Sequence, residues 1–269
     1  GMGPKMVKAL EGRAKDKGEE ILLRHRATRL ITDPQTGKVI GVKVNVKDGI
    51  KNFKANRAVI IATGGFGRNR EMLAEYAPEM VDAIPMMPAG HVGDGLKMGL
   101  ALGAATKDIG IAVAPAWPIC VETHSNVIAP LRWGGIMVNV SGNRFHDESC
   151  KEGFYGPMTG AGMKQPGGVY WIIYDDKISK DVMGNEDQGH VTYVERSKKY
   201  KASTIEGLAE GAGIDATGLK ETIDQYNGNI DSIGYDTVFS RKFQWGSART
   251  LVKIEATPFY AIKCITALT

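Results

Sequence analysis

The sequence predicts a mixed protein of the α+β and α/β classes, organised in two parts and a short final strand. Three observations carry this prediction. Alternating apolar residues and turn signals over residues 19–65 are typical of a three-stranded antiparallel meander. Helical spacing of apolar residues flanks the meander on both sides. Beyond about Ile109, short apolar strands mix with capped helices, which indicates a second part.

The meander and the helix before it follow from periodicity and turns. Residues 5–17 have helical spacing, and residues 19–33 form a strand-like run. Residues 39–46 alternate apolar with polar side chains, and the pair Asp48-Gly49 is a hairpin signal. A third strand is expected over residues 53–65. Because its end is apolar, we expect that end to lie inside a core.

Two helices and a loop complete the first part. Residues 68–76 predict a helix that Pro78 ends, and residues 82–92 predict a loop. A helix entered through glycine follows over residues 93–105. Its apolar face is expected to hold Leu96, Leu100 and Ala104.

The second part combines strands with capped helices. Residues 135–145 and 167–176 predict strands, and Ser203 begins a capping box. Asp215 is the expected N-cap of the next helix, and a strand over residues 257–269 ends the sequence. The inward face of the helix after Asp215 is expected to hold Leu219, Ile223 and Tyr226.

Composition argues against several classes of function. The 269 residues are 43% hydrophobic and 24% charged, as in ordinary globular proteins. The net charge of +4 is dispersed, which predicts no nucleic-acid partner. Three cysteines without a CxxC pair and five scattered histidines predict neither a disulfide framework nor a metal site. No apolar run reaches the ~18 residues of a membrane span, and the sequence does not indicate a compartment.

A Gly-Gly turn at Gly64 and Gly65 is the first candidate binding feature. Alone, the pair is consistent with a tight turn after a buried strand. Thr63 adds a hydroxyl beside the turn, and Asp94 stands directly before a second glycine-flanked helix start. Amides at a helix N-terminus favour phosphate oxygens, and a carboxylate accepts hydrogen bonds from hydroxyls. Together these features indicate a nucleotide-like ligand with diphosphate and polyol parts.

Five segments then resemble one family in their order and spacing. They are RAVIIATGGFGRNREML, GDGLKMGLALGA, GGIMVNVSGNRFHDES, YNGNIDSIGYDTVFSR and TPFYAIK. This set is similar to the flavoprotein subunit family of fumarate reductase and succinate dehydrogenase, which includes soluble fumarate reductases and ketosteroid dehydrogenases. The resemblance covers essentially the whole chain.

The resemblance implies FAD as cofactor and a fold to hold it. Residues 1–109 would form a partial FAD-binding domain of the glutathione-reductase type, with the antiparallel meander and helices. Residues 110–256 would form an α+β cap domain over the substrate, and residues 257–269 would begin the return strand. The cofactor-binding residues implied are Ala27, Ala62, Thr63, Gly64, Gly65, Gly93, Asp94 and Gly95. The first would meet adenine, the next four the diphosphate and adenosine, and the last three the ribityl or pyrophosphate region.

Two FAD-binding segments of the family do not occur in this sequence: the opening GxGxxG and the final glycine-rich loop. We therefore expect the chain to be the middle of a longer flavoprotein, cut deliberately rather than encoded by a truncated gene. The remaining contacts must overcome an association entropy of ~4–15 kcal/mol, so we expect weak or no FAD binding and no turnover. The uncovered face of the partial FAD domain would allow self-association.

Fumarate reductases of this family use an Arg–Glu–Arg proton relay, of which the sequence keeps one member. Arg132 occupies the place of one relay arginine. Ala129 stands where the glutamate is expected, and Glu152 stands where the proton-donating arginine is expected. Because a dicarboxylate needs cationic partners, Glu152 has the wrong charge. Fumarate is therefore not the expected substrate.

Three residues are the catalytic candidates. Tyr155 would act as a general acid on an uncharged enone, as in the ketosteroid branch, or would be a packed loop aromatic. His146 lies in the same segment, or is a hydrogen-bonding residue of the surface. Arg132 would act at the substrate, or would form a structural salt bridge to Asp147 or Glu148.

The sequence thus predicts the central fragment of an FAD-dependent oxidoreductase. Its parent would transfer hydride between flavin and an activated C–C bond of a small molecule that is not a dicarboxylate. Trp117 and Trp133 would line an apolar pocket or pack in the core. One alternative is a fumarate reductase or succinate dehydrogenase flavoprotein with an altered proton path. The other is a non-enzymatic, self-associating module that resembles a cap.

Overall fold

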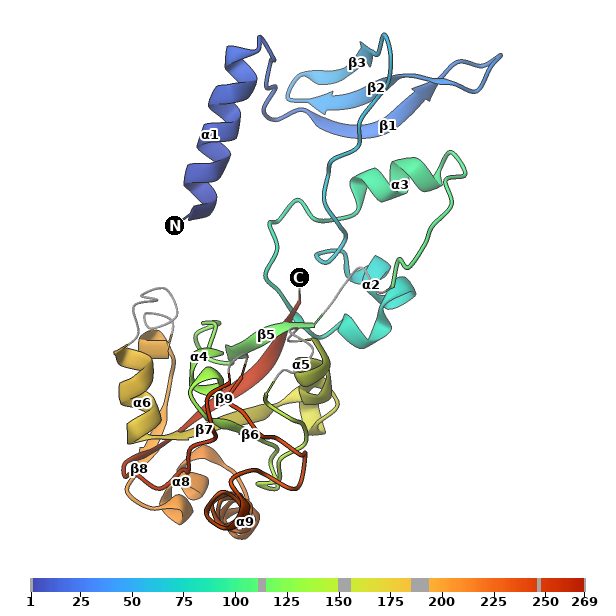
Figure 1. Cartoon of the computed structure of the whole chain (residues 1–269). Helices are drawn as coiled ribbons and strands as arrows, with labels where there is room; N and C mark the ends of the chain where they lie inside the picture. The colour runs from blue at the N-terminus through green and yellow to red at the C-terminus, as the bar shows by residue number, and fades with distance from the viewer. Residues whose placement is uncertain (1, 111–114, 150–155, 185–193, 246–247, 269) are drawn as a thin grey trace. The chain divides into compact units, whose positions relative to one another are not determined.

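The computed structural model describes residues 2–110, 115–149, 156–184, 194–245 and 248–268. The backbone divides into two compact units (Figure 1). Unit 1 consists of Gly1–Phe66 and Gly90–Lys107, and unit 2 consists of Gly67–Ala89 and Asp108–Thr269. Each unit is built around its own sheet.

Unit 1 contains the predicted meander. Its strands are antiparallel in the order β1-β2-β3, which confirms the prediction. Val46 pairs with Gly49 across a tight turn, and Gly49 has a φ of 125°, a conformation that favours glycine. The elements of the unit are α1 (Met2–Asp16), β1 (Arg26–Thr32), β2 (Val39–Val46), β3 (Gly49–Lys54) and α3 (Asp94–Leu100).

The third strand lies earlier in the chain than the predicted range 53–65 and is shorter. It covers Gly49–Lys54, whereas residues 58–65 form no strand, and Ile60 is 89% exposed. The expectation that this segment ends inside a core is therefore wrong. Its apolar side chains favour a strand, but a strand also needs a neighbouring strand to satisfy its backbone groups. Among the described residues, no strand pairs with this segment.

Other boundaries in unit 1 also differ from the predictions. The strand predicted from residue 19 begins at Arg26, and the helix predicted to residue 105 ends at Leu100. The first helix forms as predicted, with Gly18 after its end at a φ of 80°. Local spacing thus located the elements but not all of their ends.

Unit 2 is a sheet covered by helices. Its central strand is β9, which pairs antiparallel with β5, β7 and β8 and parallel with β4, while β6 pairs with β7. The strands are β4 (Ile84–Pro85), β5 (Pro115–Cys120), β6 (Ile136–Val138), β7 (Tyr170–Asp175), β8 (Tyr200–Ala202) and β9 (Phe259–Leu268). The helices include α2 (Arg70–Tyr76), α4 (Ala129–Arg132), α5 (Gly156–Met163), α6 (Asp176–Met183), α8 (Ile205–Ala212) and α9 (Ala216–Ile233), with short 3-10 turns at Pro78–Met80 and Pro166–Gly168.

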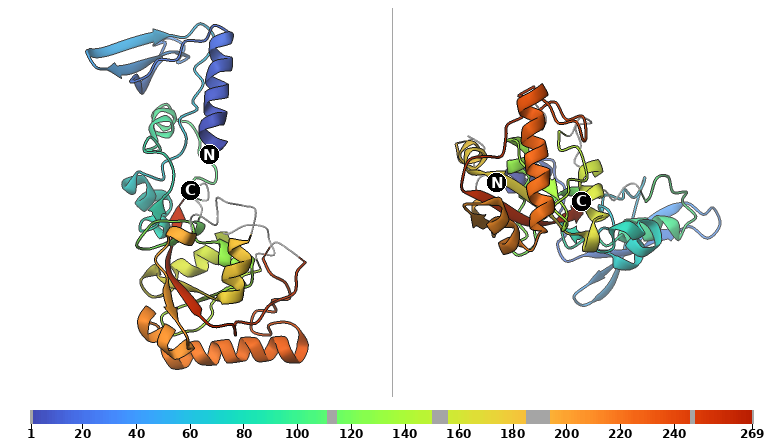
Figure 2. Two further views of the ribbon diagram at one scale, coloured as in Figure 1. Left: turned by 90° about the vertical axis from the view of Figure 1, so that its left-hand side faces the viewer. Right: turned by 90° about the horizontal axis from the view of Figure 1, so that it is seen from below.

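Side-chain caps mark the starts of α2, α6, α8 and α9. Asp215 accepts a hydrogen bond from the Gly218 N–H at the start of α9, as predicted. The cap of α8 is Thr204, whose hydroxyl accepts from the Gly207 N–H, so the prediction of Ser203 is wrong by one residue. Two adjacent hydroxyl residues carry the same signal, and the backbone geometry at the helix start selects between them. Figure 2 shows α9 as one straight helix beside α8.

The hydrophobic core of unit 2 forms between β7, β9 and the helices. All six residues of β7 are buried, in agreement with the apolar strand predicted there. Leu219, Ile223 and Tyr226 are buried against this core, as the periodicity of α9 predicts. Trp117 and Trp133 are partly buried and pack against the core. No helix among the described residues is long and apolar enough to cross a membrane.

Candidate functional site

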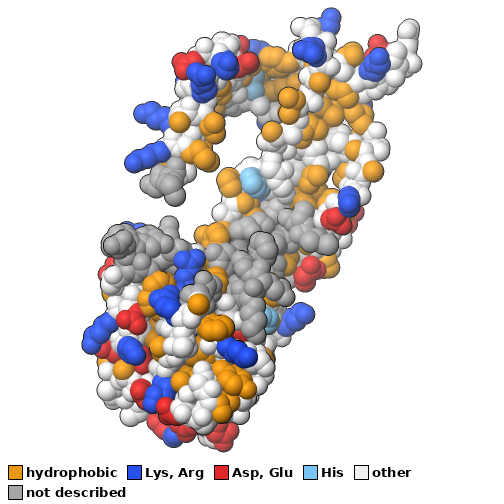
Figure 3. Space-filling view, viewed as in Figure 1, with side chains coloured by type: hydrophobic (Ala, Val, Ile, Leu, Met, Phe, Trp, Pro, Cys, Tyr) orange, Lys and Arg blue, Asp and Glu red, His pale blue; other side chains and the backbone are white. Residues whose placement is uncertain are grey.

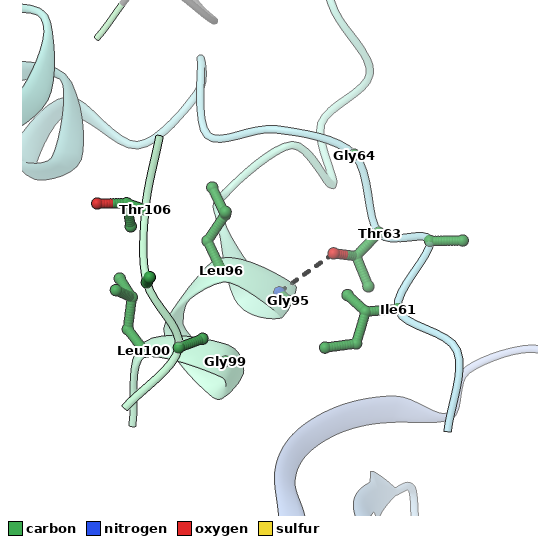
Figure 4. A pocket seen from close by; sticks show the side chains of 11 residues that line it. Ile61, Thr63, Gly64, Gly95, Leu96, Gly99, Leu100 and Thr106 are labelled. Carbon is green, nitrogen blue, oxygen red and sulfur yellow. Dashed lines mark hydrogen bonds between the residues drawn. The ribbon is translucent and has the colours of Figure 1, made fainter. Parts of the chain in front are cut away.

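Residues 61–64 and the start of α3 approach each other closely in unit 1 (Figure 4). The Gly95 N–H donates a hydrogen bond to Thr63 Oγ1 at 3.1 Å. A Cβ atom at position 95 would lie 2.3 Å from Thr63 Oγ1 and 2.4 Å from Ile61 Cγ2. Such distances leave no room for a side chain, so glycine is required at this contact.

The Gly-Gly turn joins the same assembly. Gly64 has a φ of 72°, and a Cβ there would lie 2.6 Å from His91 Nε2. The Gly93 N–H donates to Gly65 O at 3.1 Å, and Gly93 has a φ of 81°. Both glycines adopt left-handed conformations that other residues rarely adopt. The two glycine-flanked segments of the sequence therefore form one structure.

A pocket of about 330 Å³ opens beside this contact. It is lined mainly by backbone and apolar side chains, with hydroxyls from two threonines. Its walls are Ile61, Ala62, Thr63, Gly64, Gly95, Leu96, Gly99, Leu100, Ala104, Ala105 and Thr106 (Figure 4). Apolar walls with a few polar groups are typical of small-molecule sites.

Asp94 is held at the edge of this assembly by Arg26. The Arg26 Nε and Nη2 atoms donate to the two carboxylate oxygens at 2.8 and 2.9 Å. These hydrogen bonds lower the pKa of Asp94, although partial burial acts in the opposite direction. A carboxylate has about four acceptor positions, so Asp94 keeps the capacity to accept further hydrogen bonds. Arg26 precedes Ala27, which pairs with Val44 in the meander.

All eight predicted cofactor-binding residues therefore lie in unit 1. Thr63, Gly64, Gly65, Gly93 and Gly95 are connected by direct contacts. The sequence predicts that backbone amides at the start of α3 are available to phosphate. The Gly95 N–H is not available, because it already donates to Thr63 Oγ1. The assignment of these eight residues to particular parts of FAD stays a prediction.

Of the three catalytic candidates, the structure describes Arg132 and His146, which belong to unit 2. The Arg132 guanidinium stacks over the ring of Trp245, 5.1 Å from its centroid. Glu148 is bound by other arginines and no described carboxylate pairs with Arg132, so the alternative of a salt bridge to Asp147 or Glu148 is wrong. His146 is half-buried, and its Nδ1 lies 2.9 Å from Asp147 O. Tyr155 and Glu152 lie outside the described residues.

A buried ion network was missed by the sequence reasoning. Glu148 accepts from Arg144 at 3.0 and 2.5 Å and from Arg241 at 3.1 Å, and Arg144 also pairs with Asp236 at 2.8 Å. Glu148, Asp236 and Arg241 have no exposed side-chain surface, and Arg144 has almost none. The sequence did indicate these positions indirectly, because each of the four residues lies in a segment that carried the family resemblance.

The network holds the backbone that follows Arg132. Arg241 donates to Gly135 O at 3.3 Å, and Glu148 accepts from the Met137 N–H at 3.0 Å. Burial alone would raise the pKa of Glu148, but Arg144 and Arg241 outweigh it and lower that pKa. The Glu148 carboxylate is therefore charged, and its two oxygens accept hydrogen bonds from Arg144, Arg241 and the Met137 N–H.

No group of three or more His, Cys, Asp or Glu side chains within the described ranges gathers in a way that could hold a metal ion.

The comparisons with known proteins agree with one another. A family profile described as "FAD binding domain" matches residues 1–267. The chain is 31% identical to the probable fumarate reductase Ifc3 of Shewanella frigidimarina, over 97% of this chain and 42% of that protein. It resembles the open conformation of a flavocytochrome c3 fumarate reductase with a TM-score of 0.75 and 30% identity, over 99% of this chain and 44% of the other.

A third relative comes from the steroid branch. The 3-ketosteroid-delta4-(5alpha)-dehydrogenase from Rhodococcus jostii RHA1 has a TM-score of 0.72 and 25% identity, over 96% of this chain and 50% of that one. This chain therefore spans half or less of the length of these three relatives. Its mixed helix and sheet fold is similar to that of the flavocytochrome fumarate reductase. The chain belongs to the FAD-binding oxidoreductase family that includes fumarate reductases and ketosteroid dehydrogenases, and FAD is its cofactor.

Proposed function

We propose that this chain is the central part of an oxidoreductase that transfers hydride between FAD and an activated C–C bond of a substrate other than a dicarboxylate. The observation that carries the proposal is Ala129. Its side chain is 4% exposed and belongs to the hydrophobic core. A carboxylate three residues before Arg132 would have to ionise inside that core, at a high desolvation cost.

The mostly apolar pocket of unit 1, with hydroxyls from Thr63 and Thr106, fits a portion of a cofactor such as FAD. The glycine contact brings residues 61–64 against α3 beside the pocket, and Asp94 keeps acceptor capacity at the edge. Residues Ala62 to Gly65 and Gly93 to Gly95 would hold FAD there, with Ala27 beside adenine. When bound, FAD supplies the acceptor or donor of the hydride. In this proposal, residues 1–109 are a partial FAD domain of the glutathione-reductase type and residues 110–256 are its cap.

Arg132 has the role of orienting the substrate. Its guanidinium lies against Trp245 and its charge is not consumed by a described carboxylate, so it can donate to a carbonyl oxygen. Polarisation of that oxygen activates the adjacent C–C bond toward hydride transfer. Tyr155 is proposed as the group that gives or takes the proton, with His146 as a second candidate in the same segment. The negative Glu152 opposes binding of a second carboxylate.

The substrate class is tested by binding, because we propose that the chain alone does not turn over. Tryptophan fluorescence would be titrated with fumarate and with an uncharged steroid enone, for the wild type and for Arg132→Gln. We expect the enone to change the emission of the wild type, with weaker affinity in the variant, and fumarate to have no effect. Saturable binding of fumarate that Arg132→Gln abolishes would overturn the proposal.

Weak retention of FAD is tested separately. The purified chain would be incubated with excess FAD and desalted, and its visible absorption near ~450 nm measured. We expect little or no bound flavin, because the contacts available must offset about 4–15 kcal/mol of association entropy. A stoichiometric flavin band would show that these residues suffice, and activity assays on enones and dicarboxylates would follow.

A second candidate function is reduction of fumarate by an altered proton path. It is favoured by the 31% identity to a probable fumarate reductase and by the 0.75 TM-score to a fumarate reductase structure. The same titration distinguishes the two, because this candidate requires Arg132-dependent binding of fumarate.

A third candidate is a self-associating module. Apolar side chains lie on the surface of unit 1, including α1 (Figure 3), and Met6, Val7 and Leu10 are all exposed. Exposed apolar patches of this kind mark association surfaces or aggregation sites. Size-exclusion chromatography over a range of concentrations tests it: a monomer at every concentration contradicts this candidate, and a dimer that Leu10→Lys disperses supports it.

A further inference from the structure

Two free cysteines lie opposite each other in the sheet of unit 2. Cys120 ends β5 and Cys264 lies in β9, and the antiparallel register pairs them directly. Both are free thiols with no exposed surface. Paired residues of an antiparallel ladder project from the same face of the sheet. The two side chains are therefore neighbours.

Backbone hydrogen bonds define the spacing of this pair. The Val121 N–H donates to Lys263 O at 3.0 Å, so Val121 and Lys263 form the hydrogen-bonded pair. The Cys120 N–H points to the other side and donates to Ser125 O at 2.9 Å. Cys120 and Cys264 are thus a non-hydrogen-bonded pair, for which the Cα atoms lie about 4.5 Å apart. A disulfide needs about 4.4–6.8 Å between Cα atoms, and this register falls within that range.

The two thiols differ in their surroundings. The Cys120 thiol donates a hydrogen bond to Glu122 Oε2 at 3.2 Å, and the Glu122 side chain is 28% exposed. The Cys264 thiol donates to Ile262 O at 3.2 Å inside the sheet. Burial raises the pKa of Cys264, and the nearby Cys120 sulfur raises it further. Cys120 therefore has a proton acceptor that reaches solvent, whereas Cys264 stays a protonated thiol.

We propose that Cys120 and Cys264 form a redox-active pair that hydrogen peroxide converts into a cross-strand disulfide. The Cys120 thiol passes its proton to Glu122, and its sulfur attacks one oxygen of the peroxide. The O–O bond breaks, Cys120 becomes a sulfenic acid, and the departing hydroxide takes up a proton to form water. The Cys264 sulfur then attacks the sulfenic sulfur, the S–O bond breaks, and a second water leaves with the Cys264 proton. Two thiols are oxidised, and one peroxide is reduced to two water molecules.

The cross-link would join β5 covalently to β9, the central strand of the sheet of unit 2. The chain passes from unit 1 to unit 2 between Lys107 and Asp108, and β5 is the first strand after that passage. A disulfide between Cys120 and Cys264 closes a long loop and restricts the unfolded chain. We expect the thermal midpoint of unit 2 to rise by roughly 5 °C on oxidation.

Peptide mapping tests the pairing with the chain as it is. The protein would be titrated with hydrogen peroxide, its remaining thiols alkylated in denaturant, and the chain digested with trypsin without reduction. The three cysteines fall in different tryptic peptides: residues 108–132, 145–151 and 264–269. Cys150 is therefore an internal control.

We expect peptides 108–132 and 264–269 to appear cross-linked, with Cys150 alkylated. The thermal midpoint would rise with the cross-link and return on reduction. Cys120→Ser and Cys264→Ser would lose both effects, and Cys150→Ser would keep them. Cross-links that mainly involve Cys150, oxidation of Cys120 without a cross-link, or full alkylation of all three thiols would each overturn the proposal. The wild-type peptide map decides the question even where a serine variant fails to fold.

Discussion

The two units differ in what covers their apolar side chains. In unit 2, β7 and β9 lie in a core that helices close on the outside. In unit 1, the hydrophobic side chains that are buried are few: Leu30, Val44, Phe66 and Met98. Its exposed large hydrophobic side chains are Met6, Val7, Leu10, Ile21, Leu22, Leu23, Ile40, Ile50, Ile60, Ile61 and Leu102. Similar sequence patterns have thus led to burial in one unit and exposure in the other.

Helices α1 and α9 show the difference most directly. Both have apolar residues at helical spacing, and both form. The apolar face of α9 lies on the core of unit 2, whereas Leu10 of α1 is 62% exposed. Isolated helices of about 12–15 residues are marginal in water, and packing of an apolar face supplies most helix stability in proteins. We therefore expect the two units to differ in stability and in sensitivity to mutation.

The largest effect is expected in the buried ion network of unit 2. Glu148→Gln should lower the free energy of unfolding by about 3–5 kcal/mol, because it leaves Arg144 and Arg241 buried with less compensation. Urea unfolding monitored by tryptophan fluorescence measures it. The control is Asp224→Asn, which removes the exposed pair with Lys220 and should change the free energy by less than about 0.5 kcal/mol. Equal effects of the two variants would contradict a special role for the network.

A leucine in each unit tests the comparison itself. Leu219→Ala in α9 should lower the free energy of unfolding by about 3 kcal/mol, because Leu219 has no exposed surface and the change leaves a cavity. Leu10→Ala in α1 should change the free energy of unfolding by less than about 0.5 kcal/mol. Both are measured by urea unfolding at several protein concentrations. A large, concentration-dependent cost for Leu10→Ala would instead show that the α1 face is covered by a second copy.

A smaller effect is expected at the glycine contact of unit 1. Gly95→Ala should lower the free energy of local opening around this contact by about 1–3 kcal/mol, because the added Cβ would overlap Thr63 Oγ1 and Ile61 Cγ2. Hydrogen exchange of residues 61–66 and 93–100 measures it without relying on global unfolding. Gly99→Ala is the matched control, since its Cβ would lie 3.6 Å from Ala104 Cβ, an ordinary contact. If both variants exchange alike, the close approach does not hold unit 1 together.

The smallest effect concerns the Arg26–Asp94 pair. The hydrogen bonds from Arg26 lower the pKa of Asp94, so the pair stabilises unit 1 above the ordinary carboxyl pKa. That contribution is lost as pH falls through the lowered pKa. Arg26→Gln should raise the pKa of Asp94 toward its ordinary value, which carboxyl NMR titration measures. Lys97→Gln, which alters a weaker charge interaction with Asp94, should shift that pKa less.

Much of the fold was predictable from local pattern. The α1 helix, the antiparallel meander, the buried β7 strand and the Asp215 cap all follow from spacing and residue type. The conformation of residues 58–65 was not predictable in this way. An apolar run indicates a strand but says nothing about whether a partner strand is present. The cap at Thr204 was missed by one residue, since Ser203 carries the same chemical signal.

The candidate site, too, has features that the local sequence predicts and features that depend on tertiary contacts. Sequence alone located the two glycine segments and indicated a nucleotide-like ligand, because glycine at such turns has a steric meaning of its own. It could not show that Thr63 Oγ1 would bind the Gly95 N–H, or that Arg26 would engage Asp94 across 68 residues of chain. Nor could it show that Arg132 faces Trp245 rather than Asp147 or Glu148.

The sequence by itself determined most of the local elements, the family resemblance and the two glycine-flanked segments of the candidate site. Periodicity, capping and turn chemistry act over a few residues, so they can be read directly. Only the tertiary structure decided that Glu148, Arg144, Asp236 and Arg241 share one buried site, and that Cys120 faces Cys264. Those contacts join residues up to 144 positions apart in the chain. Their energies depend on burial and register, which the folded chain alone establishes.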